Sequence, residues 1–274
     1  MKYHSLNYNS NNVTFLDAVR KGLAPDRGLY FPEKIPKLSE KLIQNINSYS
    51  DHEIAFEVMH PFVGNEISKN KLREIIADTL IFDFPILPIN DKIATLELFH
   101  GPTLAFKDVG ARFMARCLKY ANEIKLNKSL TILVATSGDT GGAVADGFYK
   151  VEGINVVILY PKGKVSTIQE KQLTTLGENI TALEVDGTFD DCQDMVKSAF
   201  IDSDLINEIE LTSANSINIA RWLSQMFYYF IVYKNRPYPE KKLVISVPSG
   251  NFGNICAGLV AQQMGLPIDH LIAS

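Results

Sequence analysis

Lys107 lies at the start of a predicted helix, in a segment that is otherwise largely apolar. The segment, residues 98–108, reads LFHGPTLAFKD, and the helix that follows carries Phe113 and Met114. The positive end of the helix dipole and partial removal from water both favour the neutral form of such a lysine. A neutral amine is the form that makes a Schiff base with a carbonyl compound. The alternative for this segment alone is a surface lysine paired with Asp108.

A second segment rich in hydroxyl groups, residues 136–142, reads TSGDTGG and joins a predicted strand to a helix. Three hydroxyl groups and several backbone N–H groups at a helix N-terminus suit a carboxylate or a phosphate. The segment lacks the spacing of a Walker A loop and of a dinucleotide-binding glycine loop. It therefore predicts an anion site, and an ordinary capped turn is the alternative.

A third segment, residues 248–254, reads PSGNFGN and follows another predicted strand. Two glycines permit close backbone approach, and successive N–H groups can enclose a phosphate. A structural turn is the alternative. Taken together, the lysine and the two separate anion sites suit a phosphorylated carbonyl cofactor and an anionic substrate. Pyridoxal 5'-phosphate (PLP) meets that description.

Four apolar runs, each predicted to be a buried strand, must position these loops: residues 130–135, 156–160, 182–185 and 243–247. They lack the strict alternation of half-exposed strands, as expected in a parallel sheet covered on both faces. Helical segments at 141–149, 167–176 and 190–200 separate them, which indicates βαβ units. Ligands bind at the carboxyl ends of strands in such sheets, where the second and third loops lie.

The first 90 residues are predicted to be mostly helical. One helix begins after Thr14 and ends at Gly22. A second is opened by Ser50 with Glu53 and is predicted to end before Pro61, and a third covers residues 68–80.

The composition fits a globular protein of the cytoplasm. The chain has 274 residues, a net charge of −4, 46% hydrophobic residues and three cysteines. The mildly acidic balance argues against a nucleic-acid partner, and no apolar run is long enough for a membrane span. Three widely spaced cysteines indicate a reducing compartment. His52 and His60 match no common zinc spacing, so no metal is expected. The run 228–230 is predicted to be core and subunit-contact surface.

Five segments, in order, resemble the threonine synthase family of PLP-dependent enzymes. They are residues 26–36, 100–108, 136–141, 213–222 and 249–254. The resemblance implies an α/β fold with the parallel-sheet βαβ core of the fold type II (tryptophan synthase β-like) PLP enzymes and a mostly helical N-terminal region. Related families that act on serine, threonine or acetylserine generally have Asn where this chain has Asp139.

The resemblance also implies roles for individual residues. Lys107 would be the catalytic residue and would hold PLP covalently. Asp139 would contact both the cofactor and the substrate. The remaining cofactor contacts would be Gly250, Asn251, Phe252, Gly253 and Asn254. The remaining substrate contacts would be Ser137 and Thr140 at the carboxylate, and Asn215, Ser216 and Arg221 at the phosphate. Considered alone, Arg221 could form a surface ion pair, and Asn215 and Ser216 could cap a helix.

The implied reaction converts O-phospho-L-homoserine and water to L-threonine and phosphate, by γ-elimination and β-hydration. This would make the chain a carbon–oxygen lyase acting on phosphates, in the last step of threonine biosynthesis. Other fold type II enzymes, such as a threonine dehydratase or a cysteine synthase, are the first alternative. A non-catalytic ligand-binding relative is the second.

The resemblance predicts four regions: an N-terminal domain over 1–90, the PLP-lysine segment over 91–125, a small α/β domain over 126–212, and a large-domain segment over 213–274. It also implies a homodimer and a chain longer than this one. Residues 269–274 are predicted to begin a further buried strand. On these grounds we expect a form that lacks its C-terminal part, binds PLP weakly and turns over little by itself.

Overall fold

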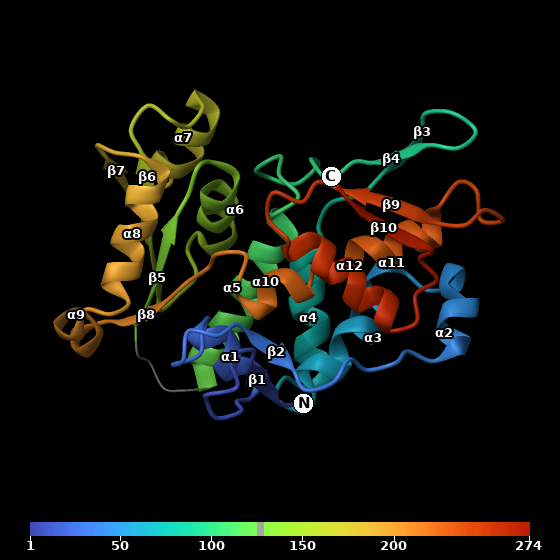
Figure 1. Cartoon of the computed structure of the whole chain (residues 1–274), viewed down its shortest axis with the longest axis horizontal. Coiled ribbons are helices and arrows are strands. Elements are labelled where there is room, and N and C mark those ends of the chain that lie inside the picture. Colours follow the sequence, from blue (N-terminus) through green and yellow to red (C-terminus); the bar gives the residue numbers. More distant parts are fainter. Residues whose placement is uncertain (125–128) are drawn as a thin grey trace.

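A four-stranded parallel sheet lies at one end of the molecule (Figure 1). The computed structural model describes residues 1–124 and 129–274. The strand order is β7-β6-β5-β8. The strands are β5 (Leu130–Ala135), β6 (Ile154–Pro161), β7 (Ile180–Val185) and β8 (Glu210–Thr212). The predicted parallel βαβ core is thus confirmed, because helices connect these strands in sequence.

Helices cover both faces of this sheet. Helix α8 (Phe189–Ala199) packs on β5 and β6, where Leu133, Leu159 and Cys192 belong to a small apolar cluster. Helix α6 (Asp139–Phe148) lies on the other face and joins the main core. The connections are completed by α7 (Thr167–Thr174) and α9 (Ser203–Glu208). Burial on both faces explains the continuous apolar runs of β5 and β6.

The N-terminal region is mostly helical, as predicted, although it also contains a short antiparallel strand pair. The strands are β1 (Tyr3–Ser5) and β2 (Tyr30–Pro32). The helices are α1 (Phe15–Lys21), α2 (Glu40–Gln44), the 3-10 turn η1 (Ile46–Ser48), α3 (Asp51–Val63) and α4 (Lys69–Thr79).

The predicted end of α3 before Pro61 is wrong. The helix continues to Val63 and ends at Gly64, whose N–H donates to the His60 carbonyl at 2.9 Å. Proline in a last turn removes only one helical hydrogen bond. Burial of Phe62 and Val63, both 0% exposed, offsets that loss.

Helix α5 (Asp108–Ile124) lies between the four-stranded sheet and the rest of the molecule (Figure 1). Helix α10 (Ile219–Leu223) packs beside it, α12 (Gly253–Gln263) packs on α10, and α11 (Met226–Asn235) packs on α12. The remaining strands form two pairs: β3 (Ile86–Pro88) with β4 (Ala94–Leu96), and β9 (Val244–Val247) with β10 (His270–Ala273). None of the helices in the described residues combines the length and hydropathy that a bilayer span requires.

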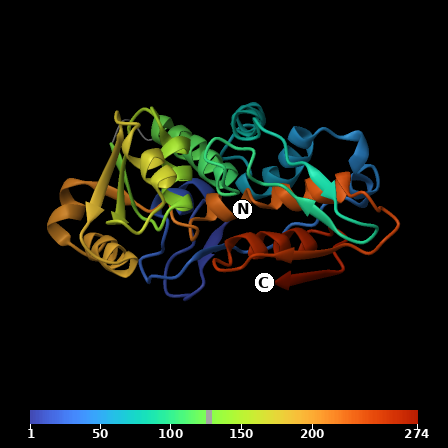
Figure 2. The same cartoon turned by 90° about the horizontal axis from the view of Figure 1, so that it is seen from above.

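Two of the four strands, and the strand predicted at 269–274, are less buried than expected. Strand β7 is an edge strand, and most of its residues are partly or fully exposed. Helices α11 and α12 lie on one side of the parallel β9–β10 pair (Figure 2). Val244 is 48% exposed and Ile272 50% exposed on this pair. An edge position or one-sided cover leaves outward residues in solvent, so the expectation of full burial is wrong there.

Candidate active site

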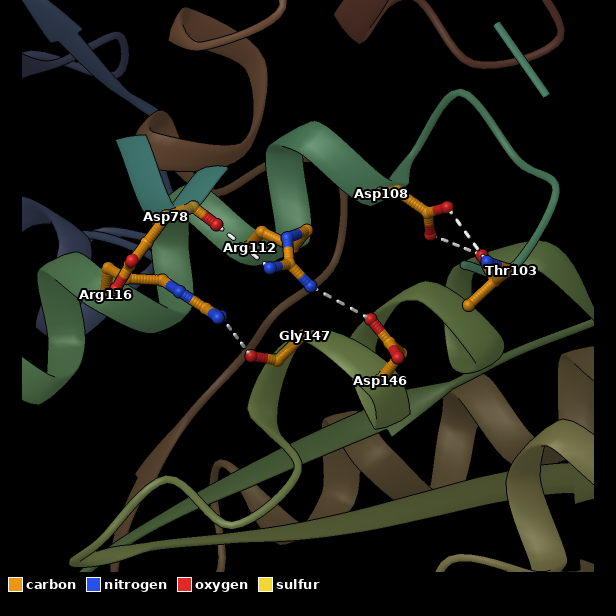
Figure 3. A network of polar contacts seen from close by, with 7 residues as sticks. All are labelled: Asp78, Thr103, Asp108, Arg112, Arg116, Asp146 and Gly147. Carbon is orange, nitrogen blue, oxygen red and sulfur yellow. Dashed lines mark hydrogen bonds and ion pairs between the residues drawn. The ribbon is translucent and has the colours of Figure 1, made fainter. Parts of the chain in front are cut away.

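Lys107 immediately precedes α5, and its amine contacts the second predicted loop. Its Nζ donates to Thr140 Oγ1 at 3.0 Å, across the boundary between α5 and α6. Asp108 is not the hydrogen-bond partner of Lys107. The Asp108 carboxylate accepts from the Thr103 N–H at 3.0 Å and from the Thr103 hydroxyl, as drawn in Figure 3. These bonds fix the loop that carries Lys107.

The surroundings of Lys107 lower the pKa of its amine. Partial burial is the largest cause, and the Arg221 charge acts in the same direction, while the Asp139 carboxylate opposes both. The neutral amine is therefore more abundant at a given pH than on a solvent-exposed lysine. This is the environment that the sequence predicted for a nucleophilic lysine.

The loop 136–142 is held from within by one of its own hydroxyl groups. Thr136 is buried, and its Oγ1 accepts from the N–H groups of Gly138 at 3.0 Å and Gly141 at 2.8 Å. The sequence predicted that this hydroxyl would help to bind an anion, but it is used inside the loop instead. Ser137 and Asp139 are exposed at the N-terminus of α6. These two side chains and Thr140 are the ones open to a ligand.

Arg221 is a fully buried cation with unused donors. It lies in α10, is 0% exposed, and its Nη1 donates to the Ala214 carbonyl at 2.6 Å. Its Nε and Nη2 have no hydrogen-bond partner in the part of the chain that the structure describes. Burial lowers the pKa of its guanidinium to about 10. A buried cation with unpaired N–H groups is costly unless an anion binds it, and its planar fork matches phosphate oxygens.

The absence of a side chain at Gly110 makes room for this arginine. A Cβ at Gly110 of α5 would lie 2.7 Å from the Arg221 carbonyl oxygen and 3.2 Å from its Nε. Glycine thus allows α10 to approach α5 closely. The guanidinium of Arg221 therefore lies near the N-terminus of α5, which follows Lys107.

Asn215 and Ser216 lie half-buried between β8 and α10. The backbone of Asn215 takes part in the local turn, since its N–H donates to Ser213 Oγ at 3.3 Å. Its carbonyl accepts from the Asn218 N–H at 3.1 Å. A Cβ at Gly253 would lie 3.5 Å from the Ser216 carbonyl, so this turn touches the third predicted loop.

The third loop is the most open part of the site. Asn251 and Phe252 are exposed, and a Cβ at Gly250 would meet nothing within 4 Å. Gly253 begins α12. Asn254 is the fixed point, because its Oδ1 accepts from the Tyr229 hydroxyl at 2.7 Å.

Two tyrosines that the sequence assigned to the core hold this arrangement together. The Tyr228 hydroxyl donates to the carbonyl of Phe106, next to Lys107, while that of Tyr229 donates to Asn254. Consecutive residues of α11 thus fix the lysine segment and the third loop. No hydrogen bond among the described residues joins that loop directly to Lys107. A signal was present in the sequence, because a buried tyrosine hydroxyl usually requires an acceptor.

These residues fit PLP and a phosphorylated substrate. The amine with the lowered pKa suits an aldehyde, the open glycine backbone at 250–254 suits a phosphate, and the unpaired N–H groups of Arg221 suit a second anion. All the loops except the lysine loop follow strands, namely β5, β8 and β9. The site therefore lies at carboxyl ends of parallel strands, as in other open α/β sheets.

Comparison with known proteins gives two family matches. Residues 2–80 match the model described as Threonine synthase N terminus, and residues 90–268 match the model described as Pyridoxal-phosphate dependent enzyme. The chain is 48% identical over 276 residues to a threonine synthase of Buchnera aphidicola subsp. Baizongia pistaciae. That match covers 100% of this chain and 64% of the relative, so the chain spans about 64% of its length.

Solved structures give the same result. A threonine synthase from Escherichia coli superposes with a TM-score of 0.93 at 44% identity, covering 100% of this chain and 64% of that one. A PLP-bound threonine synthase from Brucella melitensis gives a TM-score of 0.93 at 39% identity, with 100% and 60% coverage.

Proposed function

The chain belongs to the family of pyridoxal-phosphate dependent enzymes, and from this premise we propose that it acts as a threonine synthase. Its substrates would be O-phospho-L-homoserine and water, and its products L-threonine and phosphate. The choice of substrate rests on Arg221, a buried guanidinium with two unpaired donors, whose Nη1 donates to the carbonyl of Ala214, the residue before Asn215. Serine and acetylserine bring no phosphate to satisfy those donors.

In this proposal each residue acts on a defined part of the ligands. PLP, when bound, supplies an electron sink for the carbanion chemistry. Lys107 would hold the cofactor, and its amine would remove the Cα proton of the substrate. Thr140 orients the Lys107 amine through the hydrogen bond of 3.0 Å. The backbone from Gly250 to Asn254 holds the cofactor phosphate.

The substrate would be fixed at both ends. Ser137, Asp139 and Thr140 bind the carboxylate end, while Asn215, Ser216 and Arg221 bind the phosphate end. Two fixed ends orient Cα toward Lys107 and Cγ toward Arg221, which lowers the entropic part of the barrier. We also propose that the protein forms a homodimer, because of the family resemblance. A cytoplasmic location is proposed from the three widely spaced cysteines.

The experiment that tests this proposal compares ligands on the PLP-loaded chain. O-Phosphohomoserine should change the visible absorbance of the bound cofactor at a concentration at least about tenfold lower than serine or O-acetylserine. The reason is that only O-phosphohomoserine carries a phosphate that pairs with Arg221. Arg221→Met should remove this preference. An equal response to the three amino acids would contradict the proposed substrate.

A further inference from the structure

We propose that Gln169 of helix α7 is a positioning residue that orients Asp139 in the candidate active site. The inference rests on the proposed function, to which it adds a residue outside the five motifs. The Gln169 Nε2 donates to Asp139 Oδ1 at 2.7 Å, across from the N-terminus of α6. Asp139 is exposed, so this bond supplies a restraint that solvent does not.

The cap of α7 fixes the orientation of the Gln169 amide. Its Oε1 accepts from the Ser166 N–H at 3.2 Å and from Ser166 Oγ at 3.0 Å. These bonds form a capping box, in which the N-cap residue and the third helical residue satisfy each other. Because the oxygen is committed to Ser166, the NH2 group faces Asp139. The hydrogen-bond network therefore assigns the two ends of the amide.

The two other capping boxes in the described residues use an acid at the equivalent position. Glu53 completes the box of α3 and Asp191 that of α8. A glutamate in place of Gln169 would cap α7 equally well, but would place a carboxylate against Asp139. An amide is the side chain that both accepts from Ser166 and donates to Asp139. Capping alone therefore does not account for glutamine here.

Helix α7 also fits tightly over the loop that carries Asp139. A Cβ at Gly138 would lie 2.4 Å from Gln169 Nε2, and one at Gly142 would lie 2.8 Å from Gln172 Oε1. The Gln172 Nε2 donates to the Thr103 carbonyl at 3.2 Å, in the loop before Lys107. Residues 169 and 172 lie three apart and so on one helix face. This face links the loop of Asp139 to the lysine loop.

The expected consequence is electrostatic. The Asp139 carboxylate raises the pKa of the Lys107 amine, against the effect of burial. A hydrogen bond from Gln169 keeps that carboxylate directed toward α7 and partly offsets its charge. Loss of the bond should therefore raise the pKa of Lys107 and reduce its neutral fraction.

The experiment uses four variants of the full chain: Gln169→Glu, Asp139→Asn, the double exchange of both, and Ile168→Glu. The last adds the same charge at a neighbouring side chain that is 67% exposed. The pKa of Lys107 is measured without PLP, from the pH dependence of its acetylation by acetic anhydride, located by peptide mass spectrometry. Thermal unfolding of each variant reports on the cap.

We expect Gln169→Glu to raise the pKa of Lys107 by on the order of 1 while the melting temperature stays near wild type. Ile168→Glu should shift it much less. The double exchange should restore the wild-type value, because the amide introduced at position 139 would donate to the carboxylate introduced at position 169. Equal pKa values in Gln169→Glu and Ile168→Glu would overturn the inference. So would a double exchange in which the pKa of Lys107 stays at the value found in Gln169→Glu.

A separate arm keeps the two proposals distinguishable. Wild-type chain is incubated with PLP and reduced with borohydride. If no adduct forms, the proposed function fails, while the acetylation comparison on the PLP-free chain still decides the role of Gln169.

Discussion

At the level of single residues, the two basic side chains of the site differ in burial and in protonation. Lys107 is half-buried and has a lowered pKa, which favours a neutral nucleophile. Arg221 is fully buried and remains protonated, because burial lowers its pKa only to about 10. An unpaired buried charge destabilises the ligand-free fold, so Arg221 represents a cost in stability that a bound phosphate would offset.

Replacement of Arg221 by methionine should therefore stabilise the ligand-free chain. We expect Arg221→Met to raise the free energy of unfolding by about 1–2 kcal/mol, measured by urea denaturation without phosphate. Added phosphate should stabilise the wild type and leave the variant unchanged. Arg20→Met is the matched control. Arg20 is also buried but pairs with Glu210, so its replacement should destabilise. If Arg221→Met instead lowers the free energy of unfolding, and phosphate does not stabilise the wild type, Arg221 is not an unpaired charge that binds phosphate.

The sequence predicted some of these residue environments and not others. The apolar segment around Lys107 indicated the partial burial that lowers the pKa of its amine, although a surface lysine paired with Asp108 was the alternative for that segment alone. The use of Thr136 inside its own loop could not be predicted, since the sequence does not distinguish which of the three hydroxyl groups there accepts from the loop backbone. The roles of Tyr228 and Tyr229 depend on acceptors 122 and 25 residues away. Only the tertiary fold brings such partners together.

At the scale of elements, close helix approach decides where the site can form. Helices α5 and α10 touch at Gly110, and α7 touches the start of α6 at three glycines, Gly138, Gly141 and Gly142. Apolar spacing and caps such as Thr14 and Ser50 predicted α1, α3, α4 and the helices between the strands of the parallel sheet, but not the short strands β1 to β4 and β8 or the helices α2 and α9. The contacts that helices make at glycine could not be predicted from apolar spacing, because glycine has no side chain that would mark a buried face.

Two glycines provide a test at this scale. Gly110→Ala should cost about 1–3 kcal/mol of unfolding free energy, because its Cβ would meet backbone of α10 that cannot move away cheaply. Gly250→Ala should leave stability near wild type, since nothing lies within 4 Å of its Cβ, but should weaken PLP binding by blocking close approach. Urea denaturation and a PLP titration measure both. Similar stability losses in the two variants would show that packing at Gly110 is not special.

At the scale of the whole molecule, α5 joins the four-stranded sheet unit to the remainder. Arg112 of α5 pairs with Asp146 of α6 at 3.4 Å and donates to the Asp78 carbonyl at 2.9 Å (Figure 3). Arg116 donates to the Gly147 carbonyl at 2.7 Å. The α/β class was predictable from the alternation of runs and helices. The exposure of β9 was not, because one-sided cover depends on the assembled layers. The boundaries at 90, 125 and 212 stay predictions.

The ion pair between α5 and α6 should matter for stability. Its Arg112 side chain is only 12% exposed, so Asp146→Ala would leave a largely buried cation with fewer partners. We expect a loss of about 1–3 kcal/mol in urea denaturation. Asp194→Ala, which breaks the exposed pair with Lys197, should change little. Equal effects of the two variants would argue against a joining role for the α5–α6 contact.

If Lys107 is the residue that holds PLP, reduction of the bound cofactor should attach it to this side chain. The chain is incubated with PLP, reduced with borohydride, digested and analysed by peptide mass spectrometry. We expect the phosphopyridoxyl mass on the peptide that contains Lys107, and its loss in Lys107→Ala. The absence of any adduct in the wild type, or an unchanged yield in Lys107→Ala, would show that Lys107 does not hold PLP.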